Sequence, residues 1–248
     1  MTPPTQHPTA AAVMIGDELL SGKVSDSNSH HLVSSLRDLG CALRRIATVP
    51  DDLDLIGQEV IACAQTHDFV ITSGGIGPTH DDITMEALAL AFDCPLIRHE
   101  ALVQDIERVL GPDAPEPLFS MADIPERAEL IRDSTDQLIT IVRIENIYCL
   151  PGEPTFFRNV FDSIRERFRG IPFHHHRIYS LLDEGELADM LREIQARHTQ
   201  VAIGSYPRPK DCDHRVMVSI DSSTEDAARR AFEELLHRLP PESVVRSL

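Results

Sequence analysis

The sequence contains no tryptophan, few aromatic residues and few basic residues. Aromatic residues make up 5% of the 248 residues, and 23 lysines and arginines face 40 aspartates and glutamates, so the net charge is −17. Proteins that bind the phosphate backbone of nucleic acids need a basic surface. The composition therefore argues against a nucleic-acid partner. An anionic ligand would need local positive charge from backbone amides, a few arginines or a metal ion.

Long hydrophobic runs are absent as well. Residues 10–15 form one of the longest apolar runs, far below the roughly 18 residues that a membrane helix needs. The first eight residues carry neither a basic segment nor an apolar stretch, so no signal peptide is expected. We expect a cytoplasmic protein without membrane contact. The five cysteines, an odd number without a closely spaced pair, favour reduced thiols over a disulfide framework or a thiolate zinc site.

The first part of the chain alternates short apolar runs with apolar residues at helical spacing. Strands are predicted at residues 10–15, 43–49 and 69–72, each followed by a helical pattern. Residues 138–144 and 147–150 predict a hairpin, and the aromatic stripe of residues 156–168 predicts a core helix. Residues 111–137, rich in proline and charge, predict a long irregular insertion. The alternation indicates an α/β fold, an open and mostly parallel sheet with helices on both faces.

A second, smaller domain is predicted after a boundary near residues 170–173. The remaining chain has its own pattern of three strands and two helices, which is typical of a small α+β domain. We therefore predict two domains, residues 9–170 and residues 174–248. Three consecutive histidines, residues 174–176, stand at the boundary. Adjacent side chains do not converge easily on one metal ion, so this run is interpreted as an exposed loop.

The strongest chemical signal is the glycine-rich segment of residues 72–84, between a predicted strand and a predicted helix. Ligands bind at the carboxyl ends of strands in open α/β sheets. Glycines let the backbone approach a ligand, and a helix N-terminus directs free N–H groups to the same place. The candidate phosphate-binding residues are Ser73, Gly74, Gly75, Gly77 and Thr79. A tight turn in which Asp82 caps the helix would explain the same residues.

Two acidic pairs are expected beside this segment. Asp17 and Glu18 follow Gly16 at the end of the first strand, and Asp81 and Asp82 end the glycine-rich loop. Loops after parallel strands emerge at one edge of the sheet. Four carboxylates beside a phosphate site need a cation between them, and oxygen ligands suit Mg²⁺ or Mn²⁺. We therefore expect these four carboxylates to hold a divalent metal; solvation or helix capping is the alternative.

Four further residues are ligand-binding candidates at the same edge. Asn28, before the first predicted helix, either caps that helix or directs its amide into the pocket. Pro151 and Gly152 follow another strand and form either a third wall of the pocket or an ordinary turn. Gly16 is the corresponding candidate after the first strand. Neither a Gly-x-Ser-x-Gly elbow nor a P-loop motif is present, which argues against a serine hydrolase of that fold and a P-loop ATPase.

The string Gly-Gly-Ile-Gly-Pro-Thr-His-Asp-Asp at residues 74–82, together with residues 16–22, 26–29 and 151–154, resembles the molybdopterin-binding domain family of molybdenum cofactor biosynthesis. Within that family the chain is similar to the N-terminal region of competence/damage-inducible protein A and to the molybdopterin-binding-like domain of FAD synthase. The resemblance covers nearly the whole chain, including the second domain. It implies a three-layer α/β fold that binds pterin or dinucleotide phosphates, in a homodimer or trimer.

The resemblance also implies an activity, the metal-dependent hydrolysis of dinucleotide pyrophosphates such as FAD or ADP-ribose. In this hypothesis Mg²⁺, Mn²⁺ or Co²⁺ neutralises the phosphate charge and activates a water. Asp82 and Asp81 are the expected catalytic residues, and His80 either relays a proton or hydrogen-bonds the loop. A pterin- or nucleotide-binding protein that is non-catalytic or transfers adenylyl groups is the alternative, and a scaffold without a ligand is a third. The amidohydrolase and adenylyltransferase activities of longer relatives are not expected.

Overall fold

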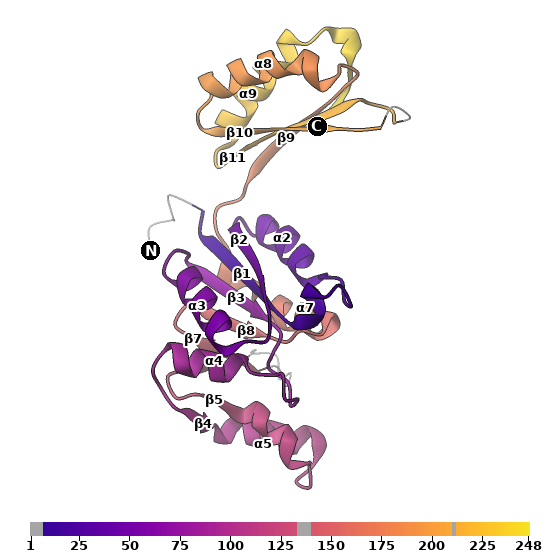
Figure 1. Cartoon of the computed structure of the whole chain (residues 1–248). Coiled ribbons are helices and arrows are strands. Elements are labelled where there is room, and N and C mark those ends of the chain that lie inside the picture. Colours follow the sequence, from indigo (N-terminus) through magenta and orange to yellow (C-terminus); the bar gives the residue numbers. More distant parts are fainter. Residues whose placement is uncertain (1–6, 133–139, 210–211) are drawn as a thin grey trace. The chain divides into compact units, whose positions relative to one another are not determined.

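The computed structural model of the protein describes residues 7–132, 140–209 and 212–248 (Figure 1). The chain forms two compact units and passes from the first to the second after Gly170, so that residues 7–170 and residues 171–248 each have their own sheet and core. Each unit is described by itself. Across these described ranges, no helix combines the length and the hydrophobicity that crossing a membrane requires.

The larger unit is built on a six-stranded sheet in the order β2-β1-β3-β8-β7-β6. The strands are β1 (Thr9–Ile15), β2 (Ala42–Val49), β3 (Phe69–Ser73), β6 (Glu129–Arg132), β7 (Thr140–Ile144) and β8 (Ile147–Leu150). From β2 to β8 all pairings are parallel, whereas β7 and β6 are added antiparallel. The predicted mostly parallel sheet is therefore confirmed, as is the hairpin of β7 and β8.

The central strand β1 shows why the sheet needs helices on both faces. Its residues are apolar without interruption and buried from Ala10 onward, as expected for a strand covered on both sides. Successive side chains point to opposite faces. Met14 accordingly packs into one core, while Val13 and Ile15 pack into the other.

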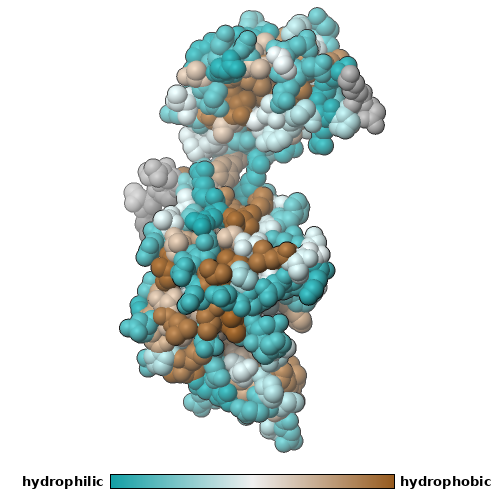
Figure 2. All heavy atoms as spheres, in the orientation of Figure 1, coloured by the Kyte–Doolittle hydropathy of each residue, from teal (hydrophilic) through white to brown (hydrophobic). Residues whose placement is uncertain are grey.

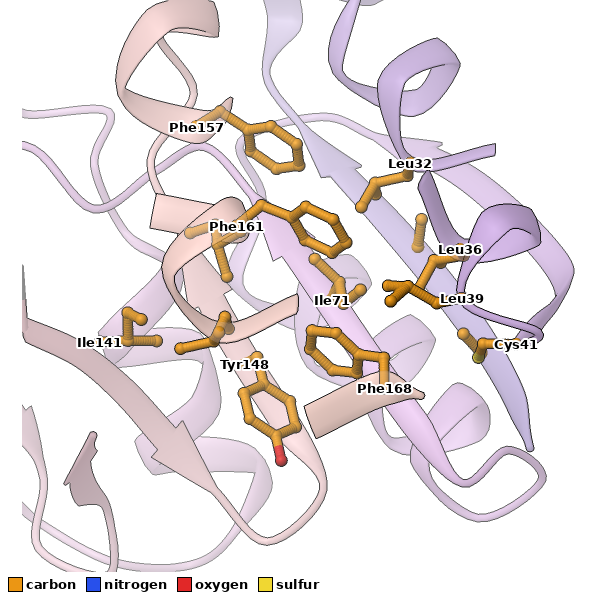
Figure 3. Close-up of a cluster of buried hydrophobic side chains, with 14 of the residues drawn as sticks. Leu32, Leu36, Leu39, Cys41, Ile71, Ile141, Tyr148, Phe157, Phe161 and Phe168 are labelled. Atoms are coloured by element: carbon orange, nitrogen blue, oxygen red, sulfur yellow. The ribbon is translucent and has the colours of Figure 1, made fainter. Parts of the chain in front are cut away.

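One face of the sheet is covered by α2 (Asn28–Asp38), α7 (Pro154–Ile164) and the short 3-10 helix η2 (Arg165–Phe168). Leu32 and Leu36 of α2 meet three aromatic rings, Phe157, Phe161 and Phe168 (Figure 3). Phe161 stacks in parallel on both neighbours, with centroids 6.5 and 5.6 Å apart. The aromatic helix is thus a core helix, as predicted.

The aromatic stripe needs one correction. The predicted stripe includes Phe156, but its side chain is 65% exposed. Phe157, Phe161 and Ile164 lie four and three residues apart and share the buried face of α7. Phe156 precedes this series by one residue, and the helical period therefore turns it toward solvent.

The opposite face of the sheet is covered by α3 (Leu53–Ala64), α4 (Thr84–Ala91) and α5 (Glu100–Leu110). Ile56, Val60, Leu88 and Leu102 are their buried contributions to this second core. Helices therefore lie on both faces of the sheet, which gives the expected three layers. The short helix α1 (Asp17–Leu20) directly follows β1.

The predicted irregular insertion at residues 111–137 is wrong for its described part. It contains α6 (Glu116–Phe119), the 3-10 helix η1 (Ser120–Ala122), β5 (Asp123–Pro125) and β6. β5 pairs with β4 (Leu96–Arg98), and β6 is an edge strand of the main sheet. Arg98 donates to Asp123 at 2.9 Å and to Glu116 at 2.6 Å, which ties the segment together. Residues 133–139, which include the start of the predicted run at 138–144, lie outside the described residues.

The smaller unit is an antiparallel sheet with two helices on one face (Figure 1). Its strands follow the order β10-β11-β9-β12. The elements are β9 (His174–Ser180), α8 (Glu184–Arg197), β10 (Val201–Pro207), β11 (Val216–Ser222), α9 (Glu225–Arg238), the 3-10 helix η3 (Pro241–Ser243) and β12 (Val244–Ser247). Ile178, Val218, Leu187 and Leu235 form the centre of its core. The predicted small α+β domain is confirmed, with β12 as an additional strand.

The histidine run at residues 174–176 was expected to be an exposed loop. This expectation is wrong, because the run forms the first part of β9. His174 Nδ1 and His176 Nε2 lie 2.9 and 3.3 Å from the carboxylate of Glu225 in α9. The His176 ring also stacks on Phe232, with centroids 4.7 Å apart. These contacts fix the histidines between the sheet and the helix.

Large hydrophobic side chains are exposed in both units, and more of them in the larger unit. Examples are Leu90 in α4, Val109 in α5 and Phe156 in α7. On the face drawn in Figure 2 hydrophobic residues lie among hydrophilic ones. Exposed apolar residues of this kind are normal on protein surfaces. One of them, Leu90, lines a groove of about 430 Å³ between α3 and α4 together with Leu53 and Ile61. The predicted polar residues lie instead at the ends of the parallel strands.

Candidate functional site

The candidate site lies where three parallel strands of the larger unit end side by side. Gly16 follows β1, Gly74 follows β3, and Pro151 follows β8, and these strands are neighbours in the sheet. The Gly74 N–H donates to Leu150 O at 3.1 Å. A Cβ on Gly152 would lie 3.2 Å from Gly74 Cα, so the two loops touch backbone to backbone. The structure therefore brings the predicted loops together at one edge.

Gly74 and Gly75 shape the loop after β3. Their φ angles are 105° and 66°, values that residues with a side chain rarely adopt. A Cβ on Gly74 would also lie 2.3 Å from the carbonyl oxygen of Ile15. Glycine at position 74 is thus required both by the turn and by the close approach of β1.

Thr84, at the start of α4, holds the same loop and was not among the predicted site residues. It is fully buried, and its Oγ1 donates to Gly74 O at 3.0 Å while its N–H donates to Gly75 O at 2.9 Å. These bonds fix the glycine turn against the first turn of the helix. A hydroxyl residue that opens a helix directly after a glycine loop is the signal that could have identified it.

Asn28 connects all three loops. Its side-chain Nδ2 donates to Ser73 Oγ at 3.0 Å and to Gly152 O at 2.8 Å. Ser73 Oγ in turn donates to Pro151 O at 3.2 Å. The alternatives for Asn28 are thereby decided, because the N–H groups of Asn28 and Ser29 are capped by Asp26 Oδ1 and the Asn28 amide turns to the strand ends.

Asp82 closes the outer part of the glycine-rich loop. Its Oδ2 accepts from Thr79 N–H at 2.8 Å and from Thr79 Oγ1 at 2.5 Å. A Cβ on Gly77 would lie 2.7 Å from the same oxygen. Asp82 is not the helix cap, because α4 begins at Thr84 with Ile83 in the capping position. Asp82 Oδ1 has no hydrogen-bond partner among the described residues.

The neighbouring residues His80 and Asp81 face solvent. His80 is 97% exposed at its side chain, and its Nδ1 lies 3.9 Å from Asp81 Oδ1. Both side chains are therefore accessible to solvent beside the loop.

The other acidic pair lies after β1. Asp17 N–H donates to Asp51 Oδ2 at 2.9 Å, which adds a carboxylate from the end of β2 to the edge. The Glu18 carboxylate folds back over Gly16, where a Cβ would lie 2.4 Å from it. Glu18 also lines a cavity of about 40 Å³ together with Asp26, Asn28 and Ser73.

The expected metal quartet is not gathered. Within the described ranges, no three His, Cys, Asp or Glu side chains lie close enough together to hold a metal ion. Mg²⁺ usually binds proteins through one or two carboxylates and completes its shell with water and substrate phosphates. The four carboxylates therefore do not form an all-protein metal cage.

Comparisons with known proteins agree with this architecture. Residues 11–169 match the family described as "probable molybdopterin binding domain", and residues 172–248 match the family described as "FAD synthase, middle domain". The first match lies on the larger unit and the second on the smaller one.

Curated relatives include proteins named FAD synthase and CinA-like protein. A protein named "Probable FAD synthase" from Caenorhabditis briggsae is 34% identical over 94% of this chain and 50% of its own length. A "CinA-like protein" from Fervidobacterium nodosum is 31% identical over 80% of this chain and 52% of its own length. The chain thus spans about half the length of these relatives.

A solved structure also matches the larger part of the fold. The CinA protein of Thermoplasma acidophilum, described as having unknown function, is 27% identical with a TM-score of 0.59. The match covers 65% of this chain and 98% of that one.

Proposed function

The chain belongs to the molybdopterin-binding domain family, and we propose that it binds a nucleotide or pterin phosphate at the edge formed by Gly16, Gly74 and Gly152. We further propose that it hydrolyses dinucleotide pyrophosphates such as FAD or ADP-ribose with Mg²⁺, Mn²⁺ or Co²⁺. The two matched domains support a function that involves nucleotides. Hydrolysis and the metal ion go beyond these matches and are part of the proposal.

The observation that carries the proposal is a run of free backbone donors. The N–H groups of Gly75, Ile76 and Gly77 donate to no described residue. Successive N–H groups in a turn with positive φ form a concave site for anions. Thr84 and Asp82 hold this turn rigidly from both ends. The loop therefore supplies the local positive potential that an acidic chain needs to bind phosphate.

The proposed reaction assigns the remaining groups. A divalent metal supplies charge neutralisation and a water made acidic enough to act as nucleophile. Asp82 Oδ1 and Asp81 are the carboxylate oxygens that would hold it beside the phosphates. Attack of water on one phosphorus breaks the P–O–P bridge and gives two monophosphates, one of which is AMP when the substrate is ADP-ribose or FAD. His80 is exposed beside Asp81 and can carry the released proton.

The test follows AMP release from ADP-ribose, FAD and NAD with Mg²⁺, Mn²⁺ or Co²⁺ and with a chelator. AMP is expected with metal and not with chelator. Asp82→Asn keeps an acceptor for Thr79 but removes the charge, and it should slow AMP release about 100-fold. Asp189→Ala, an exposed aspartate of α8 paired with Arg192, is the matched control and should leave the rate unchanged. A wild-type rate for Asp82→Asn would contradict the assignment.

A second function is favoured by the match to the FAD synthase middle domain. In that case the loop binds FAD or a pterin phosphate without hydrolysing it, or serves adenylyl transfer. The same assay separates the two candidates. Saturable FAD binding without AMP under any of the three metals would support the second function and exclude the first.

A further inference from the structure

We propose that the cavity beside Asn28 is a ribose subsite, in which the hydroxyl groups of a bound nucleotide donate to Asn28 Oδ1 and to the carboxylate of Glu18. The inference rests on the proposed nucleotide binding, not on hydrolysis. It assigns the phosphates to the glycine loop and the sugar hydroxyl groups to the space between α1 and α2.

The Asn28 amide is the first observation. Asn28 is 5% exposed, and both hydrogen bonds from Nδ2 run to the strand ends, to Ser73 Oγ and Gly152 O. These two bonds fix which way the amide faces. Its Oδ1 is buried and has no hydrogen-bond partner among the described residues. A buried acceptor left without a donor is costly and calls for a bound group that supplies one.

The lining of the cavity defines the chemistry of that group. Glu18, Asp26 and Asn28 bring acceptor oxygens, and no lysine, arginine or histidine lines the cavity. Ser73 Oγ donates to Pro151 O. Ser25 and Ser27 also line the cavity, and their hydroxyl groups can donate or accept hydrogen bonds. The carboxylates of Glu18 and Asp26 repel an anion, so the cavity suits neutral hydroxyl groups better than a phosphate.

The size of the cavity limits which group of a ligand can enter it. Its volume is about 40 Å³, which is space for about three water-sized groups. A pair of neighbouring hydroxyl groups fits in this space, whereas a whole pterin, isoalloxazine or ribose ring does not. Carboxylates at strand ends of α/β folds bind ribose hydroxyls in the same manner. Two separate acceptors, one amide and one carboxylate, match the 2′- and 3′-hydroxyl groups of one ribose.

The chain contains a second asparagine that serves as a control. Asn146, in the turn between β7 and β8, also donates two hydrogen bonds from Nδ2, to Ala64 O at 3.1 Å and His67 O at 2.9 Å. Its Oδ1 is not one of the buried atoms without a partner. Asn146 therefore braces the backbone as Asn28 does, but offers no buried acceptor to a ligand.

The experiment measures binding of ADP, 2′-deoxy-ADP and 2′,3′-dideoxy-ADP to the full chain by calorimetry with Mg²⁺ present. Each lost hydroxyl should weaken binding to the wild-type chain about tenfold. Glu18→Ala removes an exposed acceptor without touching the core, and Asn28→Ala removes the buried one. Each variant should lose about tenfold of the discrimination between ADP and the dideoxy probe. Asn146→Ala should keep the full discrimination.

Equal affinity of the wild-type chain for the three probes would overturn the ribose subsite, as would absence of ADP binding. Full discrimination retained in Glu18→Ala would overturn the role of this cavity, even if Asn28→Ala fails to fold. The assay is independent of the pyrophosphatase proposal. AMP release without hydroxyl discrimination overturns the subsite alone, and discrimination without AMP release overturns hydrolysis alone.

Discussion

The two units of the chain differ in the groups that lie at the ends of their strands. At the strand ends of the larger unit, Asn28 Oδ1 and the N–H groups of the glycine loop have no partner in the described part of the chain. In the smaller unit, ion pairs link neighbouring elements, such as His198 with Glu234 at 2.7 Å and Arg215 with Asp183 at 3.0 Å. The first arrangement offers groups to a ligand, and the second connects helices and strands.

The difference follows from strand direction. Parallel strands bring successive carboxyl ends to one edge, where the loops after β1, β3 and β8 meet. Antiparallel strands such as β9, β10 and β11 alternate their ends between the two edges. A sheet of the first kind gathers loop backbone at one place. The comparison teaches that sheet topology, more than the number of polar residues, locates the candidate site.

The substitution with the largest expected effect tests whether the two units unfold independently of each other. Phe161→Ala removes a fully buried ring between Phe157 and Phe168 and should lower the free energy of unfolding of the larger unit by about 4 kcal/mol. Native-state hydrogen exchange of the full chain should show faster exchange in residues 7–170 and unchanged exchange in residues 171–248. An equal loss of protection in both ranges would show that the two units do not unfold independently.

The second prediction compares a glycine-to-alanine substitution in the larger unit with one in the smaller unit. Gly74→Ala should destabilise the larger unit by about 3 kcal/mol, because Cβ meets Ile15 O and φ is positive. Gly185→Ala in α8, where a Cβ meets no atom within 4 Å, should stabilise the smaller unit by about 0.5 kcal/mol. Urea unfolding of both variants gives the two values. Similar effects at both glycines would contradict the described strand-end geometry.

The smallest effect is a pH dependence in the larger unit. Asp68 Oδ2 accepts from Thr9 N–H and Thr9 Oγ1, both at 2.7 Å, and these bonds hold the pKa of Asp68 below its ordinary value. The folded pKa is the lower one, so the stabilisation is present above about pH 4. It is lost as the pH falls through the folded pKa.

Asp68→Asn should therefore cost about 1 kcal/mol at pH 7, discounted for solvent screening. The cost should shrink as the pH falls below 4. Unfolding curves of both chains between pH 7 and pH 2 measure it. A cost that grows toward low pH would have the wrong sign for this hydrogen-bond pair.

Regular elements with strong periodicity could be predicted from the sequence. The apolar runs of β1 and β3 and the stripe of α2 required no distant information. Short elements could not be predicted, because β4, β5 and β12 have three or four residues each and depend on partners far along the chain. The helix α5 was missed beside a proline-rich segment, although it buries Leu102 in the second core.

The site was predictable at the level of loops and not at the level of side chains. Parallel topology implied that the residues after β1, β3 and β8 converge, and they do. The bond from Asn28 to Gly152 joins residues 124 positions apart, and no local pattern indicates it. The sequence also does not indicate where a carboxylate points. Asp82, for example, directs its Oδ2 to the Thr79 N–H. The predicted metal quartet therefore did not form.

The most direct test of the central claim locates the ligand on the chain. Hydrogen exchange of the full protein with and without ADP and Mg²⁺, resolved by peptide, reports which amides the ligand protects. The account predicts slower exchange in residues 73–84, where Gly75, Ile76 and Gly77 hold free N–H groups, and no change in residues 171–248. Protection confined to residues 171–248 would contradict it, because the binding site would then lie in the smaller unit.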